Sequence, residues 1–250
     1  MANVKASPEA QLRLLELADL DAELGRLEHR RRSLPEHAEL AELEQNDRAL
    51  RDELAALEAT EGDLRREQAK ADADVDQVRT RITRDRARLD SGQVNSPKEL
   101  ENLQSEIESL LRRQSDLEDV ELEVMERLEA AQARLKEGGG ERAGITTRLQ
   151  EVTSRRDVAV AEIAEQSGKT ADRRAAVVAD EPADLIDLYE RLRAQHGGVG
   201  AAALRRGRCE GCHLSLNTVD LNAIRAAAPD EVVRCEECRR ILVRTDESGL

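Results

Sequence analysis

Asp90-Ser-Gly-Gln-Val-Asn-Ser-Pro-Lys-Glu99 separates two long heptad repeats and carries both a helix stop and a helix start. Gly92 can adopt the left-handed conformation that ends a helix. Ser96 can cap the next helix, Pro97 suits its first position, and Glu99 completes a capping box. The segments on either side are nearly equal in length. A turn near residues 91–97 therefore predicts that two long helices fold back into an antiparallel hairpin.

The residues before and after this turn repeat in alternating steps of four and three, the spacing of a coiled coil. The first series runs from Leu50 to Leu89, and the second runs from Leu100 to Ile163. Most of these positions are apolar, so each series predicts a helix with one buried stripe. The heptad also predicts a left-handed supercoil, because seven residues fall slightly short of two α-helical turns.

The composition argues against an ordinary globular core. Charged residues make up 37% of the chain, Trp and Phe are absent, and Tyr189 is the single tyrosine. A chain rich in Ala, Glu, Leu and Arg is typical of long helices. We expect two irregularities: a break at Pro35, where the leucine phase shifts, and a weak point at Gly138–Gly140.

The C-terminal part of the chain differs from the repeats. A shorter helix is predicted between Pro182 and Gly197, with a hinge at residues 197–200. An antiparallel sheet and a helix near 219–227 are expected to follow, with short strands at residues 202–208, 232–234 and 241–244. We therefore divide the chain into a coiled-coil hairpin, residues 1–180, and a linker helix with a small zinc ribbon, residues 181–250. The predicted fold class is mainly α.

The four cysteines of the chain form two pairs in this last segment, Cys209 with Cys212 and Cys235 with Cys238. Two residues between cysteines let a turn direct both sulfurs at one ion, and two such turns supply a tetrahedron of thiolates. Thiolates favour zinc over magnesium or calcium. Because the protein fills every coordination position, we predict one structural Zn2+ rather than a catalytic ion. His213 is a further candidate ligand, although four thiolates already close the shell.

Two disulfides or a redox-active Cys-x-x-Cys pair are the alternatives for these cysteines. The polar segment from Met1 to Ala10 does not resemble a secretory signal, and no apolar run is long enough to span a membrane. We therefore expect a cytoplasmic protein without a membrane partner, in which thiols stay reduced. A zinc-bound thiol switch that releases its metal on oxidation stays open.

The charge distribution bears on the choice between a nucleic-acid and a protein partner. The net charge of -14 opposes a general affinity for phosphates. Residues 201–244 differ, with eight arginines against six acidic residues, an excess that a tetrathiolate zinc site would offset. Five arginines are candidates for a basic patch that contacts RNA, DNA or a protein partner, or they are solvated sheet edges: Arg205, Arg206, Arg208, Arg239 and Arg240. No aromatic side chain is available there to stack on bases.

No combination of residues is typical of a catalytic site. The histidines are scattered along the chain, at His29, His37, His196 and His213. We find no glycine-rich phosphate loop, nucleophile elbow or paired acid site. We therefore expect no enzymatic activity and no small-molecule substrate.

The chain resembles a bacterial family that combines an N-terminal coiled-coil hairpin with a C-terminal C4-type zinc ribbon. The resemblance spans nearly the whole chain and rests on Asn95-Ser-Pro-Lys-Glu-Leu100, Tyr189-Glu-Arg-Leu-Arg193, Cys209-Glu-Gly-Cys212-His-Leu-Ser-Leu216 and Cys235-Glu-Glu-Cys238-Arg-Arg-Ile-Leu242. It implies that the four cysteines bind zinc. Arg239 departs from the family pattern, in which glycine often follows the last cysteine. Flagellated members are adaptors that bind the alternative sigma factor for flagellar genes and are linked to messenger RNA.

These observations lead to three hypotheses. The leading one is a zinc-binding, non-enzymatic adaptor that docks on a protein partner in transcription or RNA-linked regulation. The alternative is direct binding of RNA or DNA by the arginine-rich ribbon. The third is an architectural spacer whose coil self-associates.

Overall fold

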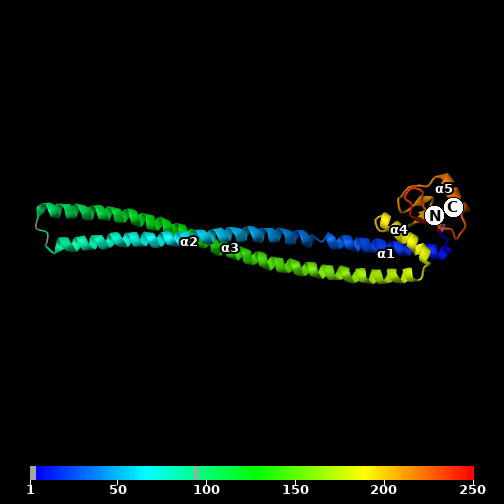
Figure 1. The fold of residues 1–250 in the computed structure, drawn as a ribbon, viewed down its shortest axis with the longest axis horizontal. Coiled ribbons are helices and arrows are strands. Elements are labelled where there is room, and N and C mark those ends of the chain that lie inside the picture. Colours follow the sequence, from blue (N-terminus) through cyan, green and yellow to red (C-terminus); the bar gives the residue numbers. More distant parts are fainter. Residues whose placement is uncertain (1–3, 93, 95) are drawn as a thin grey trace. The chain divides into compact units, whose positions relative to one another are not determined.

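The computed structural model describes residues 4–92, 94 and 96–250, so Gln93 and Asn95 of the predicted turn lie outside the described residues (Figure 1). Long helices come first, and a shorter helix and a small ribbon follow. The helices are α1 (Pro8–Arg32), α2 (Pro35–Asp90), α3 (Pro97–Ala179), α4 (Ala183–Gln195) and α5 (Thr218–Ala226), and the strands are β1 (Ala201–Arg205), β2 (Arg208–Cys209) and β3 (Ile241–Val243). This confirms the predicted fold class, a long helical hairpin followed by a small C-terminal ribbon with short strands.

The long helices begin and end where local sequence signals place them. Ser7 caps α1, and its Oγ accepts a hydrogen bond from the Ala10 N–H. α1 ends at Arg32 and α2 begins at Pro35, which confirms the break expected at this proline. No helix of the described residues is long and apolar enough to cross a membrane.

The described residues divide into two compact units. The coil unit comprises Ala38–Thr153, and the ribbon unit comprises Met1–His37 together with Ser154–Leu250. This division differs from the sequence-based boundary between residues 180 and 181. The reason is that α1 and the last part of α3 share a hydrophobic core with α4 and the ribbon strands.

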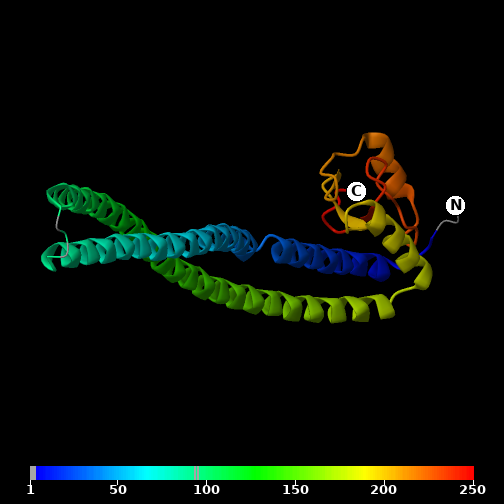
Figure 2. The same ribbon diagram turned by 60° about the vertical axis from the view of Figure 1, so that its left-hand side comes forward.

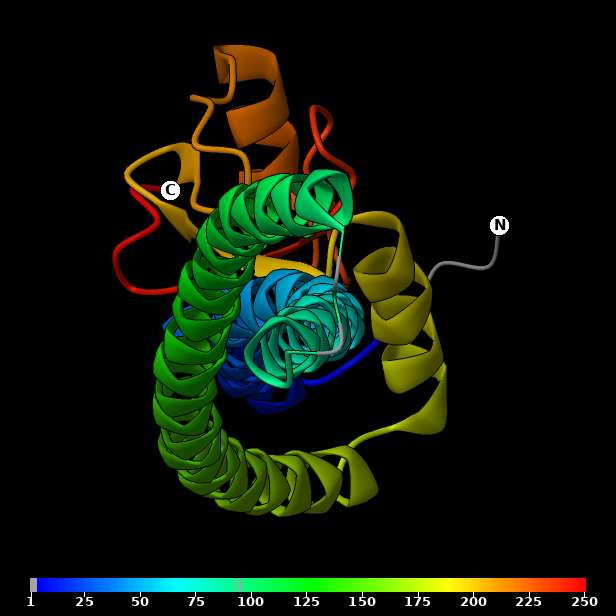
Figure 3. The ribbon, with the colours of Figure 1, turned by 90° about the vertical axis from the view of Figure 1, so that its left-hand side faces the viewer.

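In the coil unit, α2 and α3 lie side by side and run in opposite directions (Figure 2). Every position of the first heptad series is buried or partly buried, and so is every position of the second series from Leu103 to Val152. Figure 3 shows α3 curving around α2, as expected for supercoiled helices. Ion pairs between the helices confirm the antiparallel order: Arg127–Glu67 at 3.4 Å, Arg134–Glu53 at 2.9 Å and Arg148–Glu39 at 2.6 Å.

The glycine run at residues 138–140 does not interrupt α3, which is continuous through it. A β-carbon on Gly138 would lie 2.7 Å from Cδ2 of Leu54. No real β-carbon tolerates such a contact unless the leucine moves, so Gly138 allows α2 and α3 to approach closely.

The ribbon unit is built around one core that joins its helices to its sheet. Leu14 and Leu17 of α1 pack with Leu185 and Tyr189 of α4 and with Ile241 of β3. The segment before α1 adds backbone hydrogen bonds to the ribbon, from the Ala6 N–H to the Asp230 carbonyl (2.9 Å) and from the Val232 N–H to the Val4 carbonyl (3.3 Å). The N-terminal segment, α1, α4 and the ribbon therefore form a single packed body.

The sheet is mixed, whereas the sequence predicts an antiparallel one. Its order is β2-β1-β3: β1 pairs antiparallel with β2 and parallel with β3. The predicted strand at 232–234 is reduced to a bridge between Arg234 and Ile241. The second cysteine turn joins these two residues, and the Leu242 N–H donates to the Val233 carbonyl (2.9 Å) beyond it. The regular pairing of β3 is with β1.

Gly197–Gly200, predicted to be a hinge, contains two kinds of glycine. Gly197 and Gly198 have φ values of +72° and +107°, which suit the end of α4. Gly200 is buried, and a β-carbon there would lie 2.4 Å from the Tyr189 carbonyl oxygen. Gly200 therefore allows the chain to pack against α4.

Asp21 of α1 is the centre of a buried polar network in the ribbon unit. Its side chain has no exposed surface. Oδ1 lies 2.7 Å from Nε of Arg174 and 2.9 Å from Nε of Arg193, and Oδ2 accepts a 2.6 Å hydrogen bond from the Tyr189 hydroxyl. Glu190 pairs with both arginines. Because a buried carboxylate is stable only with such partners, the network ties α1 and α3 to α4.

The Tyr189 hydroxyl should resist ionisation in the folded protein. Burial raises the pKa of this phenol well above its usual value near 10, and the hydrogen bond to Asp21 raises it further. The folded state holds this proton when the unfolded state has lost it, so the contribution of Tyr189 to stability is complete below about pH 10 and declines above it. Tyrosinate absorbance, which here reports a single residue, should appear only as the ribbon unit unfolds. Simple titration near pH 10 with the fold intact would contradict this.

Candidate metal centre

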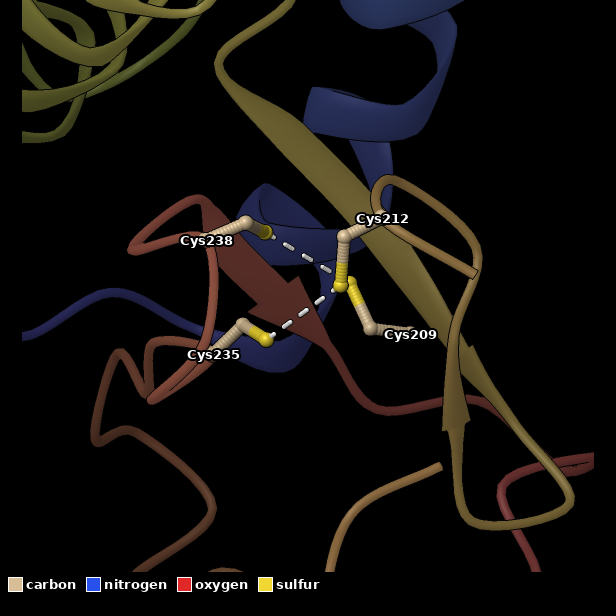
Figure 4. Close-up of side chains that lie close together, drawn as sticks. All are labelled: Cys209, Cys212, Cys235 and Cys238. Carbon is tan, nitrogen blue, oxygen red and sulfur yellow. Dashed lines mark hydrogen bonds between the residues drawn. The ribbon is translucent and has the colours of Figure 1, made fainter. Parts of the chain in front are cut away.

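The four cysteine sulfurs converge from two turns of the ribbon (Figure 4). Cys209 ends β2 and Cys212 follows in the next turn, whereas Cys235 and Cys238 lie before β3. All four sulfurs lie within 4.8 Å of one another. The separations are 3.8 Å between the sulfurs of Cys209 and Cys238, and 3.9 Å between those of Cys212 and Cys235.

These separations fit a tetrahedral zinc site. Zn–S bonds of about 2.3 Å place the sulfurs of a tetrahedron about 3.8 Å apart. A disulfide needs sulfurs about 2.0 Å apart, and the four cysteines are free thiols. The residues therefore form a C4 site for one structural Zn2+, as predicted.

The two cysteine turns have the same backbone geometry. In each turn, the carbonyl of the first cysteine accepts from the N–H of the residue directly after the second cysteine. The N–H of the first cysteine donates to the carbonyl of the next residue along. The residue directly after the second cysteine is left-handed in both turns, with φ of +60° at His213 and +63° at Arg239. The bonds are His213 N–H to Cys209 carbonyl (2.8 Å), Cys209 N–H to Leu214 carbonyl (3.0 Å), Arg239 N–H to Cys235 carbonyl (2.8 Å) and Cys235 N–H to Arg240 carbonyl (3.0 Å).

Without metal, the buried thiols hold their protons. Burial raises the pKa of the Cys209 thiol to about 12, although the N–H groups of Cys212 and Gly211 donate to this sulfur and oppose the rise. Burial also raises the pKa of Cys235. Zinc binding must therefore release protons, and the affinity for zinc should increase with pH.

The left-handed backbone of Arg239 leads to a prediction about stability. A residue with a β-carbon loses about 1–2 kcal/mol in this conformation, part of which glycine regains. We expect Arg239→Gly to stabilise the zinc-bound ribbon by about 1 kcal/mol, measured by hydrogen exchange of the amides of residues 235–243. Arg239→Ala is the control, because it removes the 3.0 Å ion pair with Glu236 and keeps the strained backbone. Equal stabilisation by alanine would contradict this explanation.

Arg240 holds the second cysteine turn against α4. Its side chain is partly buried and donates to the carbonyls of Val199 (3.1 Å), Gly211 (3.0 Å) and His196 (3.0 Å). Burial would raise the pKa of the Cys238 thiol, but donors from the Arg240 backbone and side chain lower it. Arg240 therefore supports the metal site from within. The sequence predicts Arg240 only as a candidate surface contact, because nothing in the local pattern indicates its distant partners.

The other candidate arginines are exposed but not all free. Arg205 pairs with Glu247 at 2.6 Å, and Arg208 donates to the His213 carbonyl at 2.6 Å. Arg206 lies in the turn between β1 and β2, where its N–H donates to the Glu247 carbonyl. With Asp246 and Glu247 included, residues 201–250 contain eight arginines and eight acidic residues. The C-terminal segment thus neutralises the arginine excess of the ribbon.

The remaining candidate ligand lies outside the metal cluster. Among the described residues, the group of potential ligands at this site consists of the four cysteines, and His213 is exposed. His29 belongs to α1, His37 to α2, and His196 follows α4. The structure therefore does not bring the histidines together.

Comparison with known proteins agrees with this architecture. Residues 17–197 match the model of the CT398-like coiled coil hairpin domain, and residues 208–242 match that of the C4-type zinc ribbon domain. An uncharacterized protein of Mycobacterium tuberculosis is 40% identical over 243 residues, which cover 97% of this chain and 98% of that protein.

Solved structures share the fold. A structure from Mycobacterium smegmatis has a TM-score of 0.83 and 38% identity and covers 96% of this chain and 100% of its own. The structure of CT398 from Chlamydia trachomatis has a TM-score of 0.72 with 18% identity and covers 95% of this chain and 98% of its own. The chain therefore belongs to the family of proteins with a CT398-like coiled coil hairpin domain, here followed by a C4-type zinc ribbon.

Proposed function

We propose that this protein is a non-enzymatic adaptor whose zinc ribbon docks on a protein partner in transcription or RNA-linked regulation. The observation that carries this proposal is the closed thiolate shell. Four sulfurs at tetrahedral spacing leave no coordination position for a substrate or a reactive water, so the metal organises a surface instead of performing chemistry. The setting in transcription or RNA-linked regulation follows from the resemblance to sigma-factor-binding adaptors.

The surface of the ribbon supports a docking role. Leu214, which follows the first cysteine turn, is 50% exposed, and Val219 at the start of α5 is 74% exposed. Exposed apolar side chains on a rigid support are typical of protein contacts. The shared core with α1 and α4 holds the ribbon in place. This reduces the conformational entropy that the ribbon loses on binding.

Affinity capture from a lysate of the native cells tests this role. We expect the zinc-loaded protein to retain a specific protein partner after nuclease treatment, and the Leu214→Ser, Val219→Ser variant to lose it. Val158→Ser is the matched control, because Val158 is 57% exposed and belongs to α3. Retention of the same partner by the ribbon variant, or absence of any specific partner, would refute docking through this surface.

Direct binding of RNA or DNA is the second candidate. It is favoured by the grouping of Arg205, Arg206 and Arg208 at the turn between β1 and β2. It is opposed by the pairing of Arg205 with Glu247 and by the net charge of -14. Charge reversal at Arg206 and Arg208 should abolish binding to a labelled single-stranded RNA if this candidate is correct, and unchanged binding would reject it.

A further inference from the structure

One face of α3 in the coil unit exposes apolar side chains that the hairpin does not use. Leu111, Leu122 and Met125 are 39%, 57% and 42% exposed. Residues three, four, seven or eleven positions apart share a face of an α-helix, so these three side chains form one stripe, in which Glu118 lies between Leu111 and Met125. The stripe lies beside the heptad seam rather than in it.

An acidic stripe lies next to the apolar one. Asp116, Asp119, Glu123 and Glu126 follow one another in steps of three and four, on the adjoining face of α3. All four are exposed, and none of them pairs with a cation within the described part of the chain. Residues 116–129 contain seven acidic residues and a single basic one, which pairs with Glu67 of α2. The local negative charge is therefore left largely uncompensated.

Carboxylates also crowd the other side of the apolar stripe, where α3 meets α2. Burial raises the pKa of Glu121, and a hydrogen bond and charge repulsion from Asp72 raise it further, although Arg79 opposes this. Within the stripe itself, Glu118 pairs with Arg79 of α2 at 2.6 Å. Acidic groups thus border the apolar stripe on both sides.

We propose that this acidic–apolar face, formed by Leu111, Leu122, Met125 and the four acidic residues of the adjoining stripe, docks a basic amphipathic α-helix of a partner protein. The apolar side of such a helix would cover the stripe, and its lysines or arginines would pair with the carboxylates. The same face of a second copy would bring acid against acid, and nucleic acid or anionic lipid would be repelled. The inference rests on the proposed adaptor role and adds a contact surface on the coil.

Binding of a fluorescein-labelled helical peptide made of leucine and lysine tests the charge requirement, with the full-length, zinc-loaded protein. Neutralising the acidic stripe removes four exposed ion pairs, each of modest strength. We therefore expect the affinity for the peptide to fall about tenfold or more. The variant is Asp116→Asn, Asp119→Asn, Glu123→Gln and Glu126→Gln. The matched control changes four exposed acids elsewhere on α3 by the same total charge, Glu101→Gln, Glu162→Gln, Glu165→Gln and Asp172→Asn, and should bind within about twofold of the original protein.

The double variant Leu122→Ser, Met125→Ser tests the apolar requirement and should also lower the affinity for the peptide about tenfold. Val120→Ser is its control, because Val120 is 49% exposed on a different face of α3 and its replacement should leave binding unchanged. The proposal would be overturned if both charge variants lost the same amount of peptide affinity, or if the serine variant bound the peptide as well as the original protein. Self-association through this face, measured by sedimentation velocity, would also overturn it. Leu214→Ser with Val219→Ser should leave peptide binding intact, so failure of ribbon docking is distinguishable from failure of this site.

Discussion

Removal of zinc is expected to unfold the ribbon while the coil unit keeps its helices. Zinc binding supplies of order 10 kcal/mol of folding free energy to small zinc domains. The shared core fixes one side of the ribbon, but around the metal its inner core contains few apolar residues besides the cysteines, chiefly Leu204, Ile224 and Leu242. Ile241 also packs in the core shared with α1 and α4, so these helices should lose protection as well.

Hydrogen exchange with and without a chelator measures this effect. We expect fast exchange in residues 201–243, partial loss of protection in α1 and α4, and no change in residues 38–153. Cys209→Ser should give the same pattern with zinc present. His213→Asn is the control, because asparagine tolerates the left-handed backbone and the imidazole is not a ligand. Full protection of the ribbon after zinc removal would contradict a structural role for the metal.

Asp21→Asn is expected to lower the free energy of unfolding of the ribbon unit by about 3 kcal/mol. The substitution keeps the shape of the side chain but removes its charge, and breaking a buried ion pair typically costs about 3–5 kcal/mol. Glu190 still pairs with Arg174 and Arg193, which places the loss at the lower end of that range. For a chain of this size, about 3 kcal/mol corresponds to a fall in Tm of roughly 6–12 °C.

Urea unfolding followed by tyrosine fluorescence measures this loss, because Tyr189 is the only tyrosine and lies in the network itself. Asp19→Asn provides the control on the same helix, since Asp19 is exposed and should be replaceable without a measurable change. If both variants unfold at the same urea concentration, the network does not hold α1 to α4.

Features that depend on local spacing could be predicted from the order of the residues. The heptad steps specify which side chains face the seam, Pro35 and Pro97 mark helix starts, and Gly92 has the left-handed φ of +66° expected after α2. The metal site could be predicted from the sequence for the same reason. Each Cys-x-x-Cys pair is a local turn, and thiolate chemistry selects zinc whatever lies around it.

Contacts between residues far apart in the chain could not be predicted in this way. Asp21 meets Tyr189 and Arg174 across more than 150 positions. Its spacing from Leu14 and Leu17 places it on the buried face of α1, but nothing in the local sequence identifies these distant partners. Arg240 likewise finds its carbonyl partners only when the ribbon packs on α4. The parallel pairing of β1 with β3 also arises from this packing. Spacing along the chain sets which turns and helices form, whereas burial of one apolar surface against another sets which of them share a core.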